Sequence, residues 1–243
     1  MAKVWECKDS YAEPKYAASD SSVHGQCMEI VRDVDFSRVT CATAEMFRNL
    51  TIVENCILPK VSLRLSNLHV ISRTDFRLVT NFPINTLKRI HSLRWGILPA
   101  INISGVSFSE IEVLETNFAY CKNFTWREFA TLPKQCAACT FPDIDFGGIG
   151  GGNKHMRGRS FADCDFSRIT SLDLDMLDAC TGVYSSIIGE YMVKRYAKDM
   201  GAIRRMAELK IMVKTPKGIL SLVGYAVHNP YTGTLRGLTL SYV

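Results

Sequence analysis

The sequence lacks any apolar run of the roughly 18–20 residues that a transmembrane helix needs. Its first residues, MAKVWECKDSYAEPKY, also lack the apolar core of a secretory signal. We therefore expect no transmembrane segment and no classical secretion signal. The predicted location is intracellular, in the cytoplasm of its own cell or of a host cell.

Recognisable catalytic motifs are also missing. No GxSxG, HExxH or kinase set occurs, and GxGxxG is absent. The glycine-rich stretch at 147–152 is followed by Asn153, whereas a P-loop places its lysine directly after the last glycine. We interpret this stretch as a loop between two parts of the fold. The prediction is a non-enzymatic protein without a cofactor; Cys136, His155 and the nearby acids are the first suspects if an active site exists.

Nine cysteines are present, an odd number that excludes complete pairing within one chain. Without an export signal, reduced thiols are expected. Cys136 and Cys139 form the only CxxC, which could supply half of a tetrahedral zinc site. Phe141 and Pro142 follow it, which argues against the helix of a thioredoxin-like site. We predict thiols packed in the core, with Cys136 and Cys139 as the metal candidates.

A small triplet recurs through the chain: a small or branched residue, then Asp, Asn or Ser, then Phe or Leu. Two stretches, 34–40 and 164–170, are nearly identical. We call the third residue of the triplet, Phe or Leu, the central residue. Several of the central residues are separated by multiples of five. The central residues are Phe36, Leu63, Leu68, Phe76, Phe82, Phe108, Phe118 and Phe166.

These triplets resemble the repeat of the pentapeptide-repeat family. The resemblance implies a right-handed β-helix with four pentapeptides per coil, in which the central residue and the small residue two before it point inward. Such stacking buries a continuous core one repeat at a time. The match is degenerate and covers about half of the chain. A sandwich or barrel also produces many short strands with polar turns, so that alternative stays open.

Three regions follow from the patterning, and together they predict a mostly β, α+β fold. Residues 1–30 are expected to form a polar N-terminal arm, and 31–182 a β-rich core interrupted at 147–152. The third region, 183–243, combines two elements. Apolar residues recur at threes and fours from Val183 to Lys214, which predicts helix with a break at Gly201. The remainder, from Gly218, predicts a β-hairpin with its turn at 228–233.

The net charge of +5 is concentrated in one segment. Between 190 and 217, eight basic residues stand against three acidic ones, whereas the segment 1–150 carries 16 of each sign. Such a segment could contact the phosphates of RNA or an anionic membrane. The predicted contact residues are Lys194, Arg195, Lys198, Arg204, Arg205, Lys210 and Lys214.

Two functional hypotheses remain. The family resemblance implies an interaction protein with a protein partner, and that family includes secreted bacterial effectors. The polar, serine-containing segment 1–30 is similar to an effector leader. The alternative is a viral movement or matrix protein that binds RNA or anionic membrane through residues 190–217. The sequence leaves the oligomeric state open.

Overall fold

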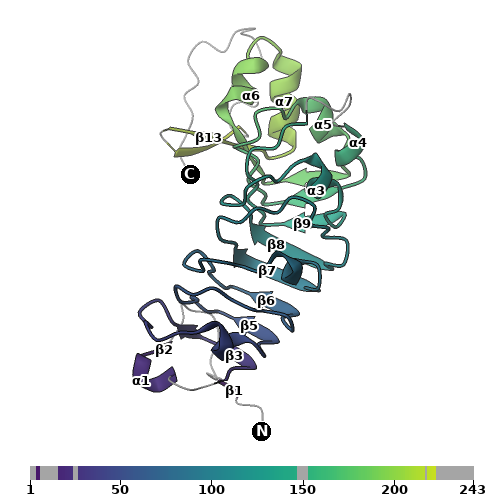
Figure 1. The fold of residues 1–243 in the computed structure, drawn as a ribbon. Coiled ribbons are helices and arrows are strands. Elements are labelled where there is room, and N and C mark those ends of the chain that lie inside the picture. Colours follow the sequence, from purple (N-terminus) through teal and green to yellow (C-terminus); the bar gives the residue numbers. More distant parts are fainter. Residues whose placement is uncertain (1–3, 6–15, 24–26, 147–152, 217, 223–243) are drawn as a thin grey trace. The chain divides into compact units, whose positions relative to one another are not determined.

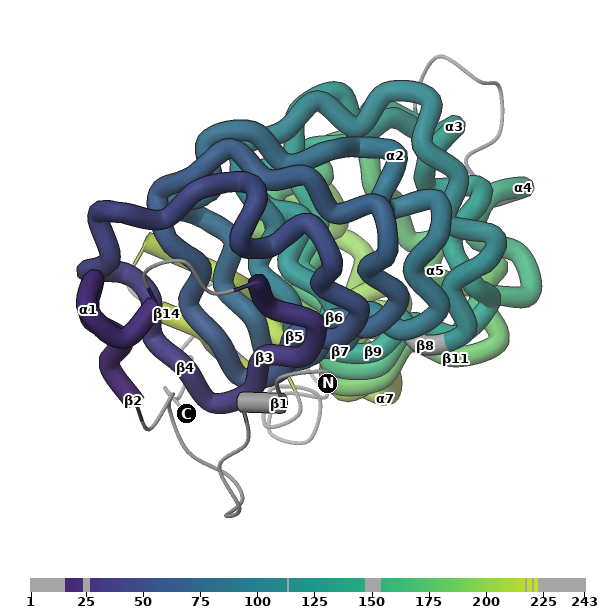
Figure 2. The backbone as a smooth tube through the Cα atoms, turned by 60° about the horizontal axis from the view of Figure 1, so that its bottom comes forward, coloured from purple at the N-terminus to yellow at the C-terminus, as the bar shows by residue number. Residues whose placement is uncertain are grey.

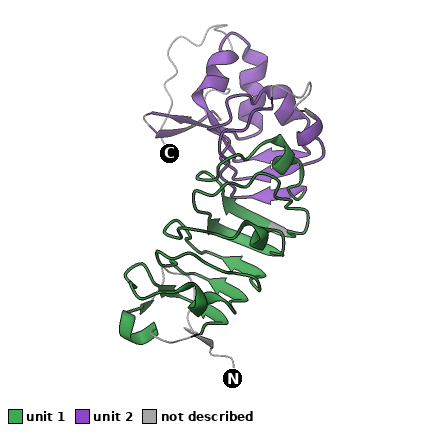
Figure 3. Cartoon of the chain, in the orientation of Figure 1, with its two compact units in different colours: residues 1–133 green, residues 134–243 purple. Residues whose placement is uncertain are grey.

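The computed structural model describes residues 4–5, 16–23, 27–146, 153–216 and 218–222. The chain divides into two compact units, residues 1–133 and 134–243 (Figure 3). Both units combine short strands with short helices, so the chain is mixed α+β (Figure 1). The predicted loop at 147–152, Lys217, and the turn and second strand of the predicted hairpin lie outside the described residues.

Unit 1 is built from short strands joined by tight turns and single helical turns. Its elements are β1 (Val4–Trp5), β2 (Tyr16–Ala17), α1 (Asp20–Val23), β3 (Ile30–Arg32), β4 (Val34–Asp35), the 3-10 turn η1 (Ala44–Phe47), β5 (Ile52–Glu54), β6 (Val70–Ser72), α2 (Ile84–Leu87), β7 (Ser92–Ile97), β8 (Val113–Asn117) and α3 (Trp126–Ala130).

A parallel sheet forms the main layer of unit 1, in the order β1-β3-β5-β6-β7-β8 (Figures 1 and 2). Within this sheet, each strand from β3 to β7 pairs in parallel with the strand that follows it in that order. Ile30 lies opposite Ile52, which lies opposite Val70, and Val70 lies opposite Ser92. The step from Ile52 to Val70 is shorter along the chain than the steps on either side of it. Coils of four complete pentapeptides would keep these steps equal, so the repeat is irregular in length.

Strands β3, β5 and β6 are each followed by a residue with left-handed backbone, where the chain turns. Asp33, Asn55 and Arg73 have φ values of 59°, 51° and 47°. Each donates its backbone N–H to the next strand, from Asn55 to the Ser72 carbonyl at 2.8 Å and from Arg73 to the Arg94 carbonyl at 2.8 Å. The hydrogen bonds to the neighbouring strand thus continue through each corner, which helps to offset the cost of this backbone conformation.

The recurring triplets supply the core. Their central residue is at most 3% exposed in all eight copies. The first residue is also buried in six of them. It is exposed at Ser66, where the chain turns, and at Thr80, where the chain bends. In the six triplets with a buried first residue, inward side chains therefore lie on both sides of the more exposed second residue, as expected for extended backbone with one buried face.

The second residue of the triplet, directly before the central Phe or Leu, has a structural role of its own. When it is Asp or Asn, its side chain can accept a hydrogen bond from the backbone N–H two positions later. Asp35 accepts from Ser37 at 2.7 Å, and Asp75 accepts from Arg77 at 2.9 Å. Asp165 repeats the pattern in unit 2, accepting from Ser167 at 2.8 Å. This local bond favours a turn directly after the buried aromatic residue.

Parts of the predicted N-terminal arm, 1–30, pack against the rest of unit 1. Strand β2 pairs in parallel with β4, and Val23 is fully buried. The Asp20 carboxylate accepts from the hydroxyl and backbone N–H of Thr40 and from the N–H of Cys41. These hydrogen bonds, led by the Thr40 hydroxyl, hold the pKa of Asp20 well below its usual value. Residues 16–23 are therefore docked on the structure.

Unit 2 also contains short strands, and two of its helices are longer than the helices described in unit 1. Its elements are β9 (Gln135–Ala137), α4 (Asn153–Met156), β10 (Ser160–Ala162), α5 (Leu174–Asp178), β11 (Gly182–Tyr184), β12 (Ile187–Gly189), α6 (Glu190–Arg195), α7 (Met200–Glu208), β13 (Met212–Thr215) and β14 (Gly218–Ser221).

Two small sheets organise unit 2. Strand β10 lies between β9 and β11, and both of its pairings are parallel. Strand β13 pairs in parallel with β12 and antiparallel with β14. The strand predicted from Gly218 is therefore present, and within the described residues its partner is the strand that precedes it. Between β10 and β11, Ser160 lies opposite Gly182, which is the same step along the chain as that from Ile30 to Ile52.

The predicted helix from Val183 to Lys214 is correct only in its middle. Residues at both ends form the short strands β11, β12 and β13, whose backbones pair with neighbouring strands. The break lies at 196–199 and not at Gly201, which is inside α7. Asp199 ends the break by capping α7, since its Oδ1 accepts the N–H of Ala202 at 3.0 Å.

Candidate functional site

Exposed histidine, arginine and tryptophan side chains lie on strand β7, directly before it, and directly beside the two ends of strand β6 in unit 1. We call His69, His91, Arg73, Arg94 and Trp95 the Trp95 face. His69 and His91 precede equivalent strand positions, and both are exposed. Their rings stack with centroids 6.0 Å apart and planes 27° apart. The backbone N–H of His91 donates to the His69 carbonyl at 3.0 Å, which holds the two residues in register.

Trp95 occupies the left-handed corner that Asp33, Asn55 and Arg73 occupy after the earlier strands. Its φ is 48°, and the register between β7 and β8 shifts between Arg94 and Gly96, so Trp95 is the extra residue of a bulge. Bulky residues rarely adopt positive φ, so tryptophan is an unusual residue at this recurring corner. The bulge turns the indole outward, where it is 45% exposed.

Glycine occupies position 96, directly after this bulge, where little space is left for a side chain. A Cβ added there would lie 3.1 Å from the Leu93 side chain, in the tightly packed interior of the sheet. Gly96 is buried, so the backbone returns inward directly after Trp95. The chain therefore exposes one large aromatic ring and buries the next residue.

Two guanidinium groups belong to this face. The Arg73 guanidinium stands over the Trp95 ring, 4.7 Å from its centroid. This cation–π contact fixes the position of an otherwise exposed ring. Arg94 is exposed and forms no ion pair with any residue that the structure describes. Opposite Arg94, Glu115 has one carboxyl oxygen that is shielded from solvent and has no hydrogen-bond partner. The face thus combines a held aromatic ring with an available cation.

The basic segment predicted to contact RNA or membrane lies on α6, α7 and β13, and four of its seven residues have partners. Lys194 pairs with Glu190 at 3.2 Å, Arg205 with Asp178 at 2.6 Å, and Lys214 with Asp165 at 3.2 Å. Arg195 donates to the carbonyls of Leu172 and Thr170. These side chains therefore stabilise unit 2 itself, a role that net charge alone does not reveal.

The other three predicted contact residues, Lys198, Arg204 and Lys210, are exposed and form no ion pair within the described part of the chain. Three available cations attract phosphates more weakly than all seven predicted contact residues would, because each phosphate contact adds separately to affinity. Binding of RNA or an anionic membrane through this segment stays a prediction.

The predicted metal candidates, Cys136 and Cys139, are buried in unit 2, at 3% and 0% exposure. No group of three or more His, Cys, Asp or Glu side chains that could hold a metal occurs among the described residues. Cys139 donates to the Ala137 carbonyl at 3.4 Å, and Cys164 donates to the Ala162 carbonyl at 3.4 Å. A hydrogen bond with Cys139 and burial raise the pKa of the Cys164 thiol, so this thiol stays protonated in the core.

We expect alkylation of the native protein to separate two classes of cysteine. Cys27 is exposed and should react first, whereas Cys56 and Cys121 should react only after unfolding. Burial raises the pKa of each of these two thiols to about 12, which leaves almost no thiolate at neutral or mildly basic pH. The measurement is peptide mass spectrometry after brief iodoacetamide treatment, with a sample in concentrated guanidinium chloride as the control. Equal native labelling of Cys27 and Cys56 would contradict this assignment.

The remaining suspects for an active site are His155 and the nearby acids. His155 is half-buried; burial, with Arg159 and Lys154 nearby, lowers its pKa. Two of the acids make structural hydrogen bonds. Asp143 accepts from the N–H of Thr170, a residue distant in sequence, at 3.1 Å, and Asp173 caps α5 by accepting from the Met176 N–H at 2.8 Å. Their hydrogen bonds explain these carboxylates as structural groups.

No protein-family model, curated protein or solved structure matches this chain. None of the helices in the described ranges combines the length and apolar character that crossing a bilayer would require.

One feature of the sequence, an irregularity in the repeat, indicates the position of the Trp95 face. Arg94 and Trp95 are bulky where a regular repeat expects small residues, and this irregularity coincides with the bulge that exposes the indole. The stacked histidines follow from the register, since His69 and His91 directly precede the paired residues Val70 and Ser92. The sequence prediction placed the candidate site in the basic segment because it could not identify the acids that neutralise those cations.

Proposed function

We propose that this protein is a degenerate pentapeptide-like β-helix that acts as a non-enzymatic interaction protein. The parallel pairing of successive strands and the inward triplet residues support the β-helix interpretation. A rigid ladder of this kind positions outward side chains at fixed spacings, because each strand is held by its neighbours on both sides. Secretion as a bacterial effector stays a prediction.

We assign the partner contact to the Trp95 face, and the exposed indole is the observation that carries this assignment. Tryptophan and arginine are the residue types that dominate binding energy at protein interfaces. Arg73 already restrains the ring, so little side-chain entropy is lost when a partner covers it. Covering the exposed part of the indole removes on the order of 100 Å² of apolar surface from water, worth roughly 2–3 kcal/mol.

The test is photo-crosslinking from position 95. We expect a photoreactive phenylalanine analogue at position 95 to give a discrete adduct with a protein of the native cell. The same analogue at Tyr184 is the matched control, because Tyr184 is an aromatic residue with 55% exposure in unit 2. Once the partner is identified, Trp95→Ala should weaken its binding by about 30-fold or more. An equal adduct from both positions, or unchanged binding by Trp95→Ala, would exclude this face.

A further inference from the structure

A second feature of unit 1 is a hollow of about 300 Å³ beside α2, which is labelled in Figure 2. Its walls come from two segments that are distant in sequence, residues 64–66 and residues 83–89. None of its lining residues belongs to the Trp95 face. The volume lies at the lower end of the range for small-molecule sites.

Two hydrogen bonds hold the walls together. The Thr86 hydroxyl donates to the Leu65 carbonyl at 2.9 Å, and Thr86 is only 3% exposed. At the rim, Nη1 of Arg89 donates to the Ser66 carbonyl at 3.1 Å. This bond anchors the guanidinium beside the hollow and leaves Nε and Nη2 of Arg89 available. The site is therefore restrained before any ligand arrives.

The lining carries positive charge without a matching acid. Arg64 and Arg89 both line the hollow, and no carboxylate does. Arg64 makes no hydrogen bond or ion pair with any described residue, in contrast to Arg77, which pairs with Asp75 at 2.6 Å. The amide of Asn85 and the hydroxyl of Ser66 also have no side-chain hydrogen bond within the described residues. Four polar side chains of the hollow thus keep unused donor capacity.

We propose that this hollow binds the phosphate group of a small organic phosphate monoester. Guanidinium groups match the geometry of phosphate oxygens through paired N–H donors, and two of them balance a dianion. Ser66 and Asn85 supply further donors for the remaining oxygens. Leu65 and Pro83 provide an apolar wall for the carbon part of the ligand. A simple carboxylate, with one negative charge and two oxygens, would use only part of this donor set. The proposal is independent of the partner contact assigned to the Trp95 face.

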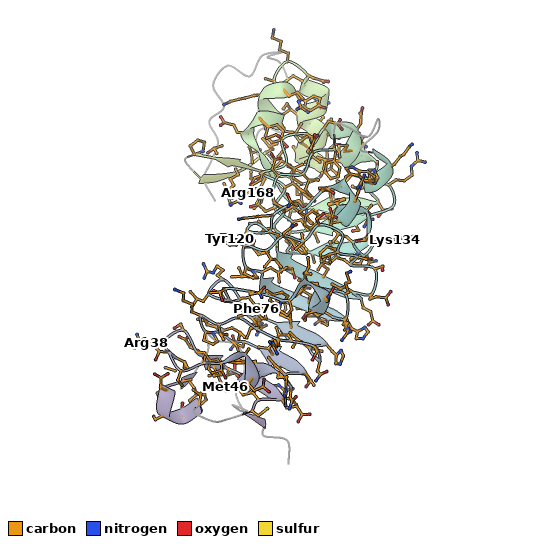
Figure 4. The ribbon with its side chains drawn as sticks, in the orientation of Figure 1. Arg38, Met46, Phe76, Tyr120, Lys134 and Arg168 are labelled. Atoms are coloured by element: carbon orange, nitrogen blue, oxygen red, sulfur yellow. The ribbon has the colours of Figure 1, made fainter. Side chains whose placement is uncertain are left out.

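The experiment is a titration of the full chain with O-phosphoserine, followed by amide chemical shifts of Ser66, Thr86 and their neighbours at constant ionic strength. We expect saturable shifts at the hollow. Arg64→Gln or Arg89→Gln should weaken binding about tenfold or more, because each removes charged hydrogen bonds. Arg38→Gln is the matched control; Arg38 is exposed, does not line the hollow, and is labelled in Figure 4. Arg64→Lys should bind with intermediate affinity, because lysine keeps the positive charge but lacks the paired N–H donors of the guanidinium group.

Two further sets of titrations define the chemistry of the ligand. Serine and succinate should leave the shifts unchanged; if either binds as well as phosphoserine, the phosphate assignment is wrong. Phosphoserine with both termini blocked distinguishes the source: equal affinity supports a phosphorylated protein segment, and lost affinity supports a free metabolite. The proposal is overturned if phosphoserine causes no saturable shift, or if Arg64→Gln and Arg89→Gln bind it as tightly as the unmodified chain does.

Discussion

Replacing Phe76 with alanine is expected to lower the free energy of unfolding by about 3–5 kcal/mol, the range for truncating a fully buried phenylalanine. Phe76 (labelled in Figure 4) is the central residue of its triplet and has no exposed surface. Its ring packs edge to face against Phe82, with centroids 5.2 Å apart. Truncation leaves a cavity that the surrounding strands cannot fill, because Asp75 is held in parallel pairing with both Ile57 and Ile97.

Leu78→Ala is the matched control for Phe76→Ala. Leu78 is a large apolar residue of the same segment, but it is 41% exposed. Its truncation should change stability by no more than about 0.5 kcal/mol. Urea unfolding followed by circular dichroism measures both variants at the same pH. If both lose the same stability, the alternation of buried and exposed positions assigned to this triplet is wrong.

The triplet pattern predicts the core well because burial there depends on alternation within a very short segment. Central Phe or Leu residues face inward wherever the backbone is extended, and the sequence shows their type directly. The prediction fails at Ser66 and Thr80, where a turn or bend rotates the first residue outward. A turn needs only local hydrogen bonds, and the same Ser, Thr and Asn residues also occur in extended segments.

Short helices in unit 1 could not be predicted in the same way. Segments α2 and α3 have four and five residues, less than two turns, so no 3.6-residue period can develop. The α3 sequence does show its start, since Thr125 and Glu128 have the spacing of a capping box. Stability of such a segment comes from its packing against the unit, which depends on residues distant in sequence.

The candidate site illustrates a different limit. Net charge along the sequence identified residues 190–217, yet Arg205 and Lys214 are neutralised by Asp178 and Asp165, which lie 27 and 49 positions earlier. Such pairing depends on the order of the strands and helices. Arg64 and Arg89 belong to residues 60–94, where seven basic residues stand against one acid, an excess that is cancelled when charge is counted over the whole segment 1–150. Within their hollow both remain without acidic partners. Counting charges along the sequence therefore shows which segments are basic. Only the fold shows which of these basic side chains lack an acidic partner and remain available to bind a ligand.

A buried carboxylate is the second feature with a large expected effect. Glu128, on α3, is only 3% exposed. Its Oε1 accepts the backbone N–H of Gly105 at 2.8 Å, and its Oε2 accepts the N–H of Thr125 at 2.9 Å and the Thr125 hydroxyl at 2.5 Å. Burial raises the pKa of Glu128, but the hydrogen bonds from Thr125 and Gly105 outweigh burial and hold this pKa below its usual value.

Glu128→Gln should therefore cost about 2–4 kcal/mol of unfolding free energy at pH 7. The glutamine amide offers one acceptor oxygen and places an N–H₂ group against donors, so the N–H of Gly105 or of Thr125 loses its partner. Gly105 has φ of 75°, in a turn that this hydrogen bond connects to α3. Glu110→Gln is the control, because Glu110 is exposed and forms no hydrogen bond or ion pair with the described residues.

The pH dependence distinguishes the ionised carboxylate from simple packing. Because the pKa of Glu128 is lower in the folded chain than its unfolded value of about 4.5, its ionisation stabilises the fold at higher pH. This contribution is complete above pH 4.5 and is lost as the pH falls through the folded pKa. The stability difference between the unmodified chain and Glu128→Gln should accordingly be constant from about pH 5 to 7 and shrink at lower pH. A difference that stays the same at low pH would show that the glutamine disturbs packing, and that the charged hydrogen bonds contribute little.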